Sequence, residues 1–161
     1  MNDRSESDRA NVRFPPPLVC VLIILAGSGL EFVVPLVSVP SASSGLRWGV
    51  GGFMLATAVA SLGVWPALLF RRSGQDLRPC TATPEILIKG PYAFTRNPMY
   101  LMWVVVCVGF AIILGSPWVL LLSPLCAVIL YFTAIRHEEA YLEQKFGDSY
   151  RSYKQQVRRW M

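Results

Sequence analysis

Two segments of the sequence contain most of the residues that could do chemistry. The first runs from Lys89 to Tyr100 and reads KGPYAFTRNPMY. Its Gly90-Pro91 pair is a turn signal, and Asn97-Pro98 favours a helix that begins at Pro98. The beginning of a helix presents free backbone N–H groups, which attract a carboxylate or a phosphate. The segment therefore predicts either an anion-binding helix end or an aromatic belt with an anchoring arginine at a membrane surface.

The second segment begins with Arg136, His137, Glu138 and Glu139. Four aromatic or aliphatic residues share the helical face of Glu138 at steps of three, four and seven: Tyr131, Ile135, Leu142 and Phe146. A carboxylate on such a face requires a cationic partner or a donor from a ligand. Arg136 and Glu139 lie on another face, where a surface ion pair and a catalytic role both remain open. We take Glu138, Arg136 and Glu139 as the candidate catalytic residues.

Apolar runs long enough to cross a bilayer must position these two segments. Hydrophobic residues make up 53% of the 161 residues and charged residues only 16%, whereas about a quarter of a soluble domain is charged. The runs predict spans at about 18–39, 46–70, 98–114 and 118–135. The connection between the last two spans is so short that they form a helical hairpin. We therefore expect an all-α membrane protein with about four transmembrane helices, this C-terminal hairpin and a cytoplasmic C-terminal helix.

The basic residues predict which ends of the spans face the cytoplasm. The net charge is +5, and Lys and Arg gather in the connection 71–96 and in the tail after Ile135. The positive-inside rule places both of these, the termini and the candidate site on the cytoplasmic side of a multi-pass protein. We expect a disordered cytoplasmic tail over 1–13, a two-helix membrane hairpin over 14–70 and a site-bearing half over 71–161. Glu31 either lines a pocket or bonds to a neighbouring helix near the far interface, and we favour the second.

Metal ions and nucleic acids are not expected partners. The cysteines at 20, 80, 107 and 126 are not clustered, and there is one histidine, so the spacing of a metal site is missing. The basic residues lie between and after apolar runs, which favours the bilayer over nucleic acid as the partner. The sequence leaves the oligomeric state open.

Together the two segments resemble the sequence pattern of the membrane methyltransferases typified by isoprenylcysteine carboxyl methyltransferase. Phospholipid methyltransferases share this pattern. The matching residues of the first segment are Gly90, Tyr92, Arg96, Asn97, Pro98 and Tyr100. Those of the second are Glu138, Glu139, Leu142, Phe146, Gly147, Tyr150 and Tyr153. The likeness covers about residues 84–158. It implies an enzyme that transfers a methyl group from S-adenosyl-L-methionine to a lipophilic acceptor, such as a prenylated cysteine.

The resemblance also implies which residues touch this cofactor. Carried over by position, they are Glu85, Ile86, Leu87, Tyr92, Asn97, Pro98, Met99, Tyr100 and Glu138. The start of the third span would hold the methionine carboxylate, and Glu138 would accept from the ammonium group. A lipophilic acceptor would enter from the bilayer.

One departure from the family pattern concerns the acceptor. Eukaryotic members have an arginine one turn before the motif glutamate, where this chain has Ala134. Arg136 points about 160° away from that position on a regular helix, so whether Arg136 or Arg96 replaces the missing arginine stays open. A carboxylate, an amine and a thiol all remain possible acceptors. Two other functions remain as alternatives: a membrane reductase with a nicotinamide cofactor, and a non-catalytic membrane component that kept the fold.

Overall fold

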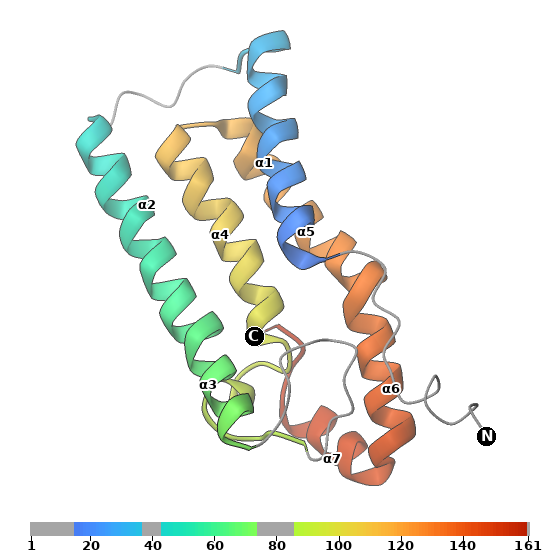
Figure 1. Cartoon of the computed structure of the whole chain (residues 1–161). Helices are drawn as coiled ribbons and strands as arrows, with labels where there is room; N and C mark the ends of the chain where they lie inside the picture. Colours follow the sequence, from blue (N-terminus) through green and yellow to red (C-terminus); the bar gives the residue numbers. More distant parts are fainter. Residues whose placement is uncertain (1–14, 37–42, 74–85, 161) are drawn as a thin grey trace, which may run out of the picture.

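The computed structural model describes residues 15–36, 43–73 and 86–160, and within these ranges every regular element is a helix (Figure 1). In chain order these are α1 (Pro16–Val33), α2 (Ser44–Ala58), a π-helical segment (Val59–Val64), α3 (Trp65–Arg72), a 3-10 turn (Gly90–Ala93), α4 (Pro98–Leu114), α5 (Pro117–Leu130), a second π-helical segment (Tyr131–Ile135), α6 (Arg136–Phe146) and α7 (Asp148–Gln156). The predicted all-α membrane class is confirmed. The predicted disordered tail over 1–13 lies outside the described residues.

In the described part of the chain, three continuous helices are long and apolar enough to cross a membrane: Pro16–Val33, Ser44–Arg72 and Pro117–Phe146. The shorter α4 has 17 apolar residues and begins and ends where the sequence predicts. The helix that contains the fourth predicted span continues past Ile135 through α6, as the helical spacing from Tyr131 to Phe146 predicts. Its apolar composition ends near Ile135, and the residues that follow are good helix formers such as Arg, Glu, Leu and Lys.

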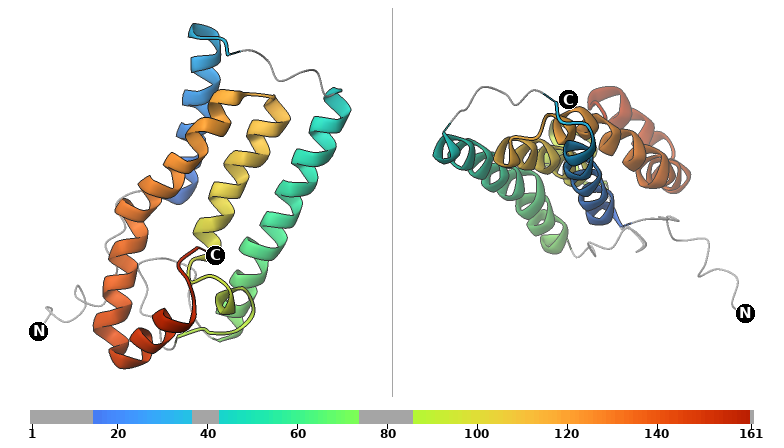
Figure 2. Two further views of the ribbon diagram at one scale, coloured as in Figure 1. Left: turned by 180° about the vertical axis from the view of Figure 1, so that it is seen from behind. Right: turned by 90° about the horizontal axis from the view of Figure 1, so that it is seen from above.

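The central helix is α4, which packs against α1, α2 and α5, while α1 also packs along α5. Figure 1 shows α4 between α2 and the pair of α1 and α5, and the views in Figure 2 agree. Small residues allow the close approach of α2 and α4: a Cβ atom on Gly51 would lie 2.5 Å from Ile113 Cγ1 and 2.9 Å from the carbonyl oxygen of Gly109. Gly51 therefore allows the backbones of α2 and α4 to approach closely.

The two π-helical segments interrupt the long helices at defined places. The first, Val59–Val64, comes just before Pro66. A proline lacks an N–H and its ring meets the preceding turn, and a widened turn accommodates it. The second, Tyr131–Ile135, lies between α5 and α6. It changes the direction in which the side chains of α6 point relative to those of α5.

The end of the bundle away from α7 is closed by hydrogen bonds between helices. The Ser116 hydroxyl donates to Glu31 Oε2 at 3.0 Å, and the Trp118 indole donates to the carbonyl oxygen of Val34 at 2.7 Å. Glu31 is thus bonded to the turn between α4 and α5, as we favoured, which satisfies its carboxylate near the end of the span. Gly115 makes this turn at a φ of +64°, a conformation that glycine adopts without strain.

At the other end, α4 begins well short of the ends of α3 and α6, as Figure 1 shows. The 3-10 turn, α7 and residues 157–160 occupy the space below it. Gly147, with a φ of +53°, makes the sharp turn from α6 into α7. The chain then reverses, and Tyr150, Tyr153 and Val157 are buried against α6 and the 86–88 strip. This return of the chain encloses the candidate site.

Candidate active site

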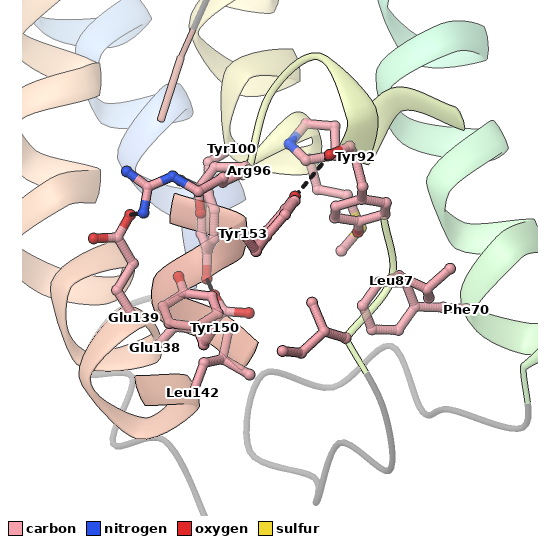
Figure 3. Close-up of a pocket in the computed structure, with 14 residues that line it drawn as sticks. Phe70, Leu87, Tyr92, Arg96, Tyr100, Glu138, Glu139, Leu142, Tyr150 and Tyr153 are labelled. Atoms are coloured by element: carbon pink, nitrogen blue, oxygen red, sulfur yellow. Dashed lines mark hydrogen bonds and ion pairs between the residues drawn. The ribbon is translucent and has the colours of Figure 1, made fainter. Parts of the chain in front are cut away.

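A pocket lies at the start of α4 and encloses about 620 Å³, including space open to solvent (Figure 3). Its walls come from the end of α3, the segment 86–97, the first turn of α4, α6 and α7. The lining residues are Phe70, Ile86, Leu87, Tyr92, Arg96, Asn97, Pro98, Met99, Tyr100, Glu138, Glu139, Leu142, Tyr150 and Tyr153.

One wall of the pocket is formed by a carboxylate from α6 and a phenol from α4. The Tyr100 hydroxyl donates to Glu138 Oε2 at 2.9 Å, and Figure 3 shows the two side chains meeting across the pocket. No other residue in the described part of the chain donates a hydrogen bond to Glu138. The carboxylate is surrounded mainly by protein, so its second oxygen, Oε1, can accept a hydrogen bond from a donor in the pocket.

Glu139 is held by two arginines. Arg159 donates from Nε to Oε1 at 2.9 Å and from Nη2 to Oε2 at 2.8 Å, a bidentate pair. Arg96 Nη1 lies 3.3 Å from Oε1, and the Arg96 side chain is only 8% exposed. The pairing with Glu139 raises the pKa of Arg159 above its usual range. All three groups are therefore charged, and Glu139 is neutralised within the protein.

The segment 157–160 crosses the loop before α4 and makes these contacts possible. The Arg96 backbone N–H donates to the carbonyl oxygen of Arg158 at 3.0 Å. The hydroxyl of Thr95 and the amide of Asn97 both donate to the carbonyl oxygen of Arg159, at 2.9 and 3.4 Å. Trp160 packs against the core between α1, α4 and α5. These bonds fix the segment against the Thr95–Asn97 strip.

Three buried tyrosines complete the pocket. Burial, together with the charge of Glu138, raises the pKa of Tyr92 above its usual range, and burial and the charge of Glu139 do the same for the pKa of Tyr150. Burial raises the pKa of Tyr153 to about 12, although the positive charge of Arg96 opposes this. All three are protonated at neutral pH and act as hydrogen-bond donors; Tyr153 donates to the carbonyl oxygen of Tyr92 at 2.7 Å. None of them serves as a base.

Most of the residues predicted to touch a cofactor line this pocket. They are Ile86, Leu87, Tyr92, Asn97, Pro98, Met99, Tyr100 and Glu138. Glu85 lies outside the described residues. Of the predicted catalytic residues, Glu138 and Glu139 line the pocket, whereas Arg136 has an exposed side chain and does not. Arg136 and Glu138 are two positions apart, so a helix turns their side chains to nearly opposite sides.

The interpretation of Glu139 as a surface ion pair is wrong, because the residue is 7% exposed and its partners are Arg96 and Arg159. That interpretation assumed a solvated face, which the returning C-terminal segment covers. Five further lining residues were absent from the predicted cofactor contacts: Phe70, Arg96, Leu142, Tyr150 and Tyr153. Four of them belong to the two sequence segments, and only Phe70 had no signal there. Within the described residues, no group of three or more His, Cys, Asp or Glu could hold a metal ion.

Comparison with known proteins shows the family of this chain. The sequence profile of the phospholipid methyltransferase family matches residues 46–149, well over half of the chain. An uncharacterized protein of Haemophilus influenzae is 40% identical over 63 residues, which are 39% of this chain and all of that protein. The protein-S-isoprenylcysteine O-methyltransferase of Schizosaccharomyces pombe is 35% identical over 72 residues, 45% of this chain and 30% of that enzyme. No solved structure matches. The chain is therefore a membrane protein that belongs to the phospholipid methyltransferase family.

Proposed function

We propose that this protein transfers a methyl group from S-adenosyl-L-methionine to a lipophilic acceptor at the cytoplasmic boundary of the membrane. Family membership supports methyl transfer, and the basic residues near the pocket end support the cytoplasmic side. The observation that carries the proposal is one pocket in which Glu138 has an oxygen available and Arg96 has buried nitrogen atoms without hydrogen bonds. This pocket lies at the end of apolar helices, where a lipid could reach it.

The side chains present fit the proposed cofactor. An amino-acid group carries an ammonium and a carboxylate, and the pocket offers a carboxylate on α6 together with donors at the start of α4 and on Arg96. The first amides of α4 lack partners within the helix and favour negative charge. The faces of Tyr92 and Tyr100 suit a sulfonium, and the apolar side chains of Ile86 and Leu87 suit a purine.

The protein's contribution to the reaction is to position the reactants and exclude water. The cofactor supplies an electrophilic methyl group when bound. Glu138 would orient its amino-acid end, because Tyr100 already fixes the direction of the carboxylate. Tyr150 and Tyr153, 1% and 4% exposed, close the pocket towards α7 and keep water from the reacting atoms.

An acceptor that is already ionised suits the groups in the pocket. Glu139 is doubly paired with arginines, and the buried tyrosines keep their protons, so these groups do not remove a proton at neutral pH. A carboxylate acceptor needs no base, because it is ionised at pH 7. We therefore favour a lipophilic carboxylate, such as a prenylated cysteine, over an amine or a thiol.

The decisive experiment is ligand binding by the purified protein in detergent, followed by a transfer assay. We expect calorimetry to show binding of S-adenosylhomocysteine and no binding of NADPH. We also expect the transfer of labelled methyl from S-adenosylmethionine to lipid-soluble products of a membrane extract. Heat-denatured protein is the control for both measurements. Binding of NADPH alone would indicate a reductase, and binding of neither would indicate a non-catalytic component.

A further inference from the structure

Residues 157–160 do more than pack against the helices, because they place the guanidinium of Arg159 beside the pocket. Arg159 binds Glu139 through two hydrogen bonds and lies with its guanidinium 4.9 Å from the centre of the Tyr131 ring. Its backbone carbonyl oxygen accepts from Thr95 and Asn97. Arg159 is thus fixed at both its side chain and its backbone, yet it is not among the residues that line the pocket.

Arg159 uses both oxygens of Glu139, and this determines what Arg96 can do. Arg96 lies within ion-pair distance of Glu139, but its Nε and Nη1 atoms are buried and make no hydrogen bond to any described residue. Buried guanidinium nitrogens without acceptors cost free energy, so such atoms are normally satisfied. Arg96 lines the pocket with a side chain that is 8% exposed. Arg96 therefore stands in the pocket wall with hydrogen-bonding capacity that its ion pair with Glu139 does not fill.

We infer that Arg159 is a positioning residue of this pocket: it takes both oxygens of Glu139 in hydrogen bonds, limits Arg96 to an ion pair with that carboxylate, and so leaves donors of Arg96 for a carboxylate of the ligand. The inference rests on the proposed function. Without Arg159, the nearest carboxylate to Arg96 is Glu139, whose Oε1 is only 3.3 Å from Nη1. A small rotation of Arg96 would then turn this ion pair into a hydrogen-bonded pair and remove its donors from the pocket.

The carboxylate could belong to the methionine part of the cofactor or to the acceptor, and two pairs of probes separate these sources. The first pair is S-adenosylhomocysteine and its decarboxylated analogue, which keeps the amine. The second pair is N-acetyl-S-farnesylcysteine and its methyl ester. For each pair, calorimetry in detergent gives the ratio of the two affinities. A charge-assisted hydrogen bond from Arg96 should make this ratio about tenfold or more in one of the pairs.

The test compares Arg159→Gln with the matched control Arg158→Gln, which removes the same charge from a neighbouring residue with an exposed side chain. We expect Arg158→Gln to keep the tenfold preference and Arg159→Gln to reduce it to about twofold or less. The double variant Glu139→Gln with Arg159→Gln should restore the preference, because Arg96 then has no competing carboxylate. The double variant also tests the inference if Arg159→Gln alone folds poorly, because a merely structural role of Arg159 would not restore the preference.

The outcomes separate this inference from the proposed function. If the wild-type protein binds no S-adenosylhomocysteine, the proposed function is wrong and the inference is wrong with it. If the wild-type protein binds it but prefers neither carboxylate, Arg96 holds no carboxylate and the inference alone is overturned. Equal preferences in Arg159→Gln and Arg158→Gln would also overturn it.

Discussion

Replacement of Glu138 by Gln should have opposite effects on ligand binding and on stability. The substitution keeps the size of the side chain and an oxygen that can accept from Tyr100, whose hydroxyl now donates at 2.9 Å. It removes the negative charge that we propose pairs with the ammonium group of the cofactor. A charged hydrogen bond contributes about 1.5–3 kcal/mol, so the affinity for S-adenosylhomocysteine should fall by about 10- to 150-fold.

The stability of the folded protein should rise in the same variant. The carboxylate of Glu138 is largely removed from water and stands next to Glu139, so its charge costs free energy when no ligand is bound. A neutral amide avoids this cost and loses only about 1 kcal/mol from the weaker bond with Tyr100. We expect a net gain of about 1 kcal/mol, which is about 2–4 °C in the unfolding midpoint of a chain of this size.

Calorimetry and thermal unfolding in detergent, followed by tryptophan fluorescence, measure the two quantities. Glu143→Gln is the control, because Glu143 lies on the same helix and pairs with Lys154 and Arg151 away from the pocket. This control should change neither quantity appreciably. If Glu138→Gln lowers the midpoint by several degrees and leaves the affinity within about threefold, the carboxylate is structural and our reasoning about the pocket fails.

Three further outcomes follow from the structure. The pKa of Tyr153 is raised to about 12 from 10.0, so the contribution of the Tyr153 phenol to stability is full below pH 10 and is lost as the pH rises to about 12. Between these pH values the free energy of unfolding of the wild-type protein should fall by about 3 kcal/mol more than that of Tyr153→Phe, as measured by thermal unfolding. Equal losses in the two proteins would contradict this expectation. Gly51→Ala should destabilise the protein by about 1–3 kcal/mol, because the added Cβ would lie 2.5 Å from Ile113. The control Gly52→Ala should not destabilise it, because a Cβ there meets nothing within 4 Å. Similar unfolding midpoints of the two variants would refute the packing of α2 on α4. Arg136→Gln should bind S-adenosylhomocysteine with an affinity within about twofold of the wild-type value by calorimetry, because the Arg136 side chain lies outside the pocket. A tenfold loss of affinity would place Arg136 in the site.

Much of the fold could be predicted because its determinants are local. Pro98 and Gly115 mark the ends of α4, and an apolar run between them leaves one interpretation. The continuation of the last long helix beyond Ile135 was also predictable, because Tyr131, Leu142 and Phe146 keep a helical spacing after the apolar run ends. The π-helical segments had no sequence signal beyond Pro66, since a widened turn depends on packing as well as on sequence.

The candidate site was predictable where residues lie close in sequence or share a helical face. Glu138 was found by its helical face, whereas Asn97 and Tyr100 were assigned to the cofactor by the resemblance to the family, and all three line the pocket. The environment of Glu139 could not be predicted, because it depends on Arg159, which lies 20 residues away beyond two turns of the chain. A helical projection of α6 shows only which side chains share a face, and no periodicity shows that a later segment returns to cover one of those faces.

The short length of α4 has a consequence for how an acceptor is reached. Its 17 residues rise about 25 Å, less than the roughly 30 Å of bilayer hydrocarbon, and its lower end lies inside those of α3 and α6 (Figure 1). With α4 spanning the bilayer, a pocket at its start would lie at the edge of the lipid tails, so an acceptor with a hydrocarbon chain need not be extracted. Each methylene that stays in the bilayer avoids about 0.8 kcal/mol. Selection among acceptors would then depend on how deeply the polar group sits, and little on the length of the chain behind it.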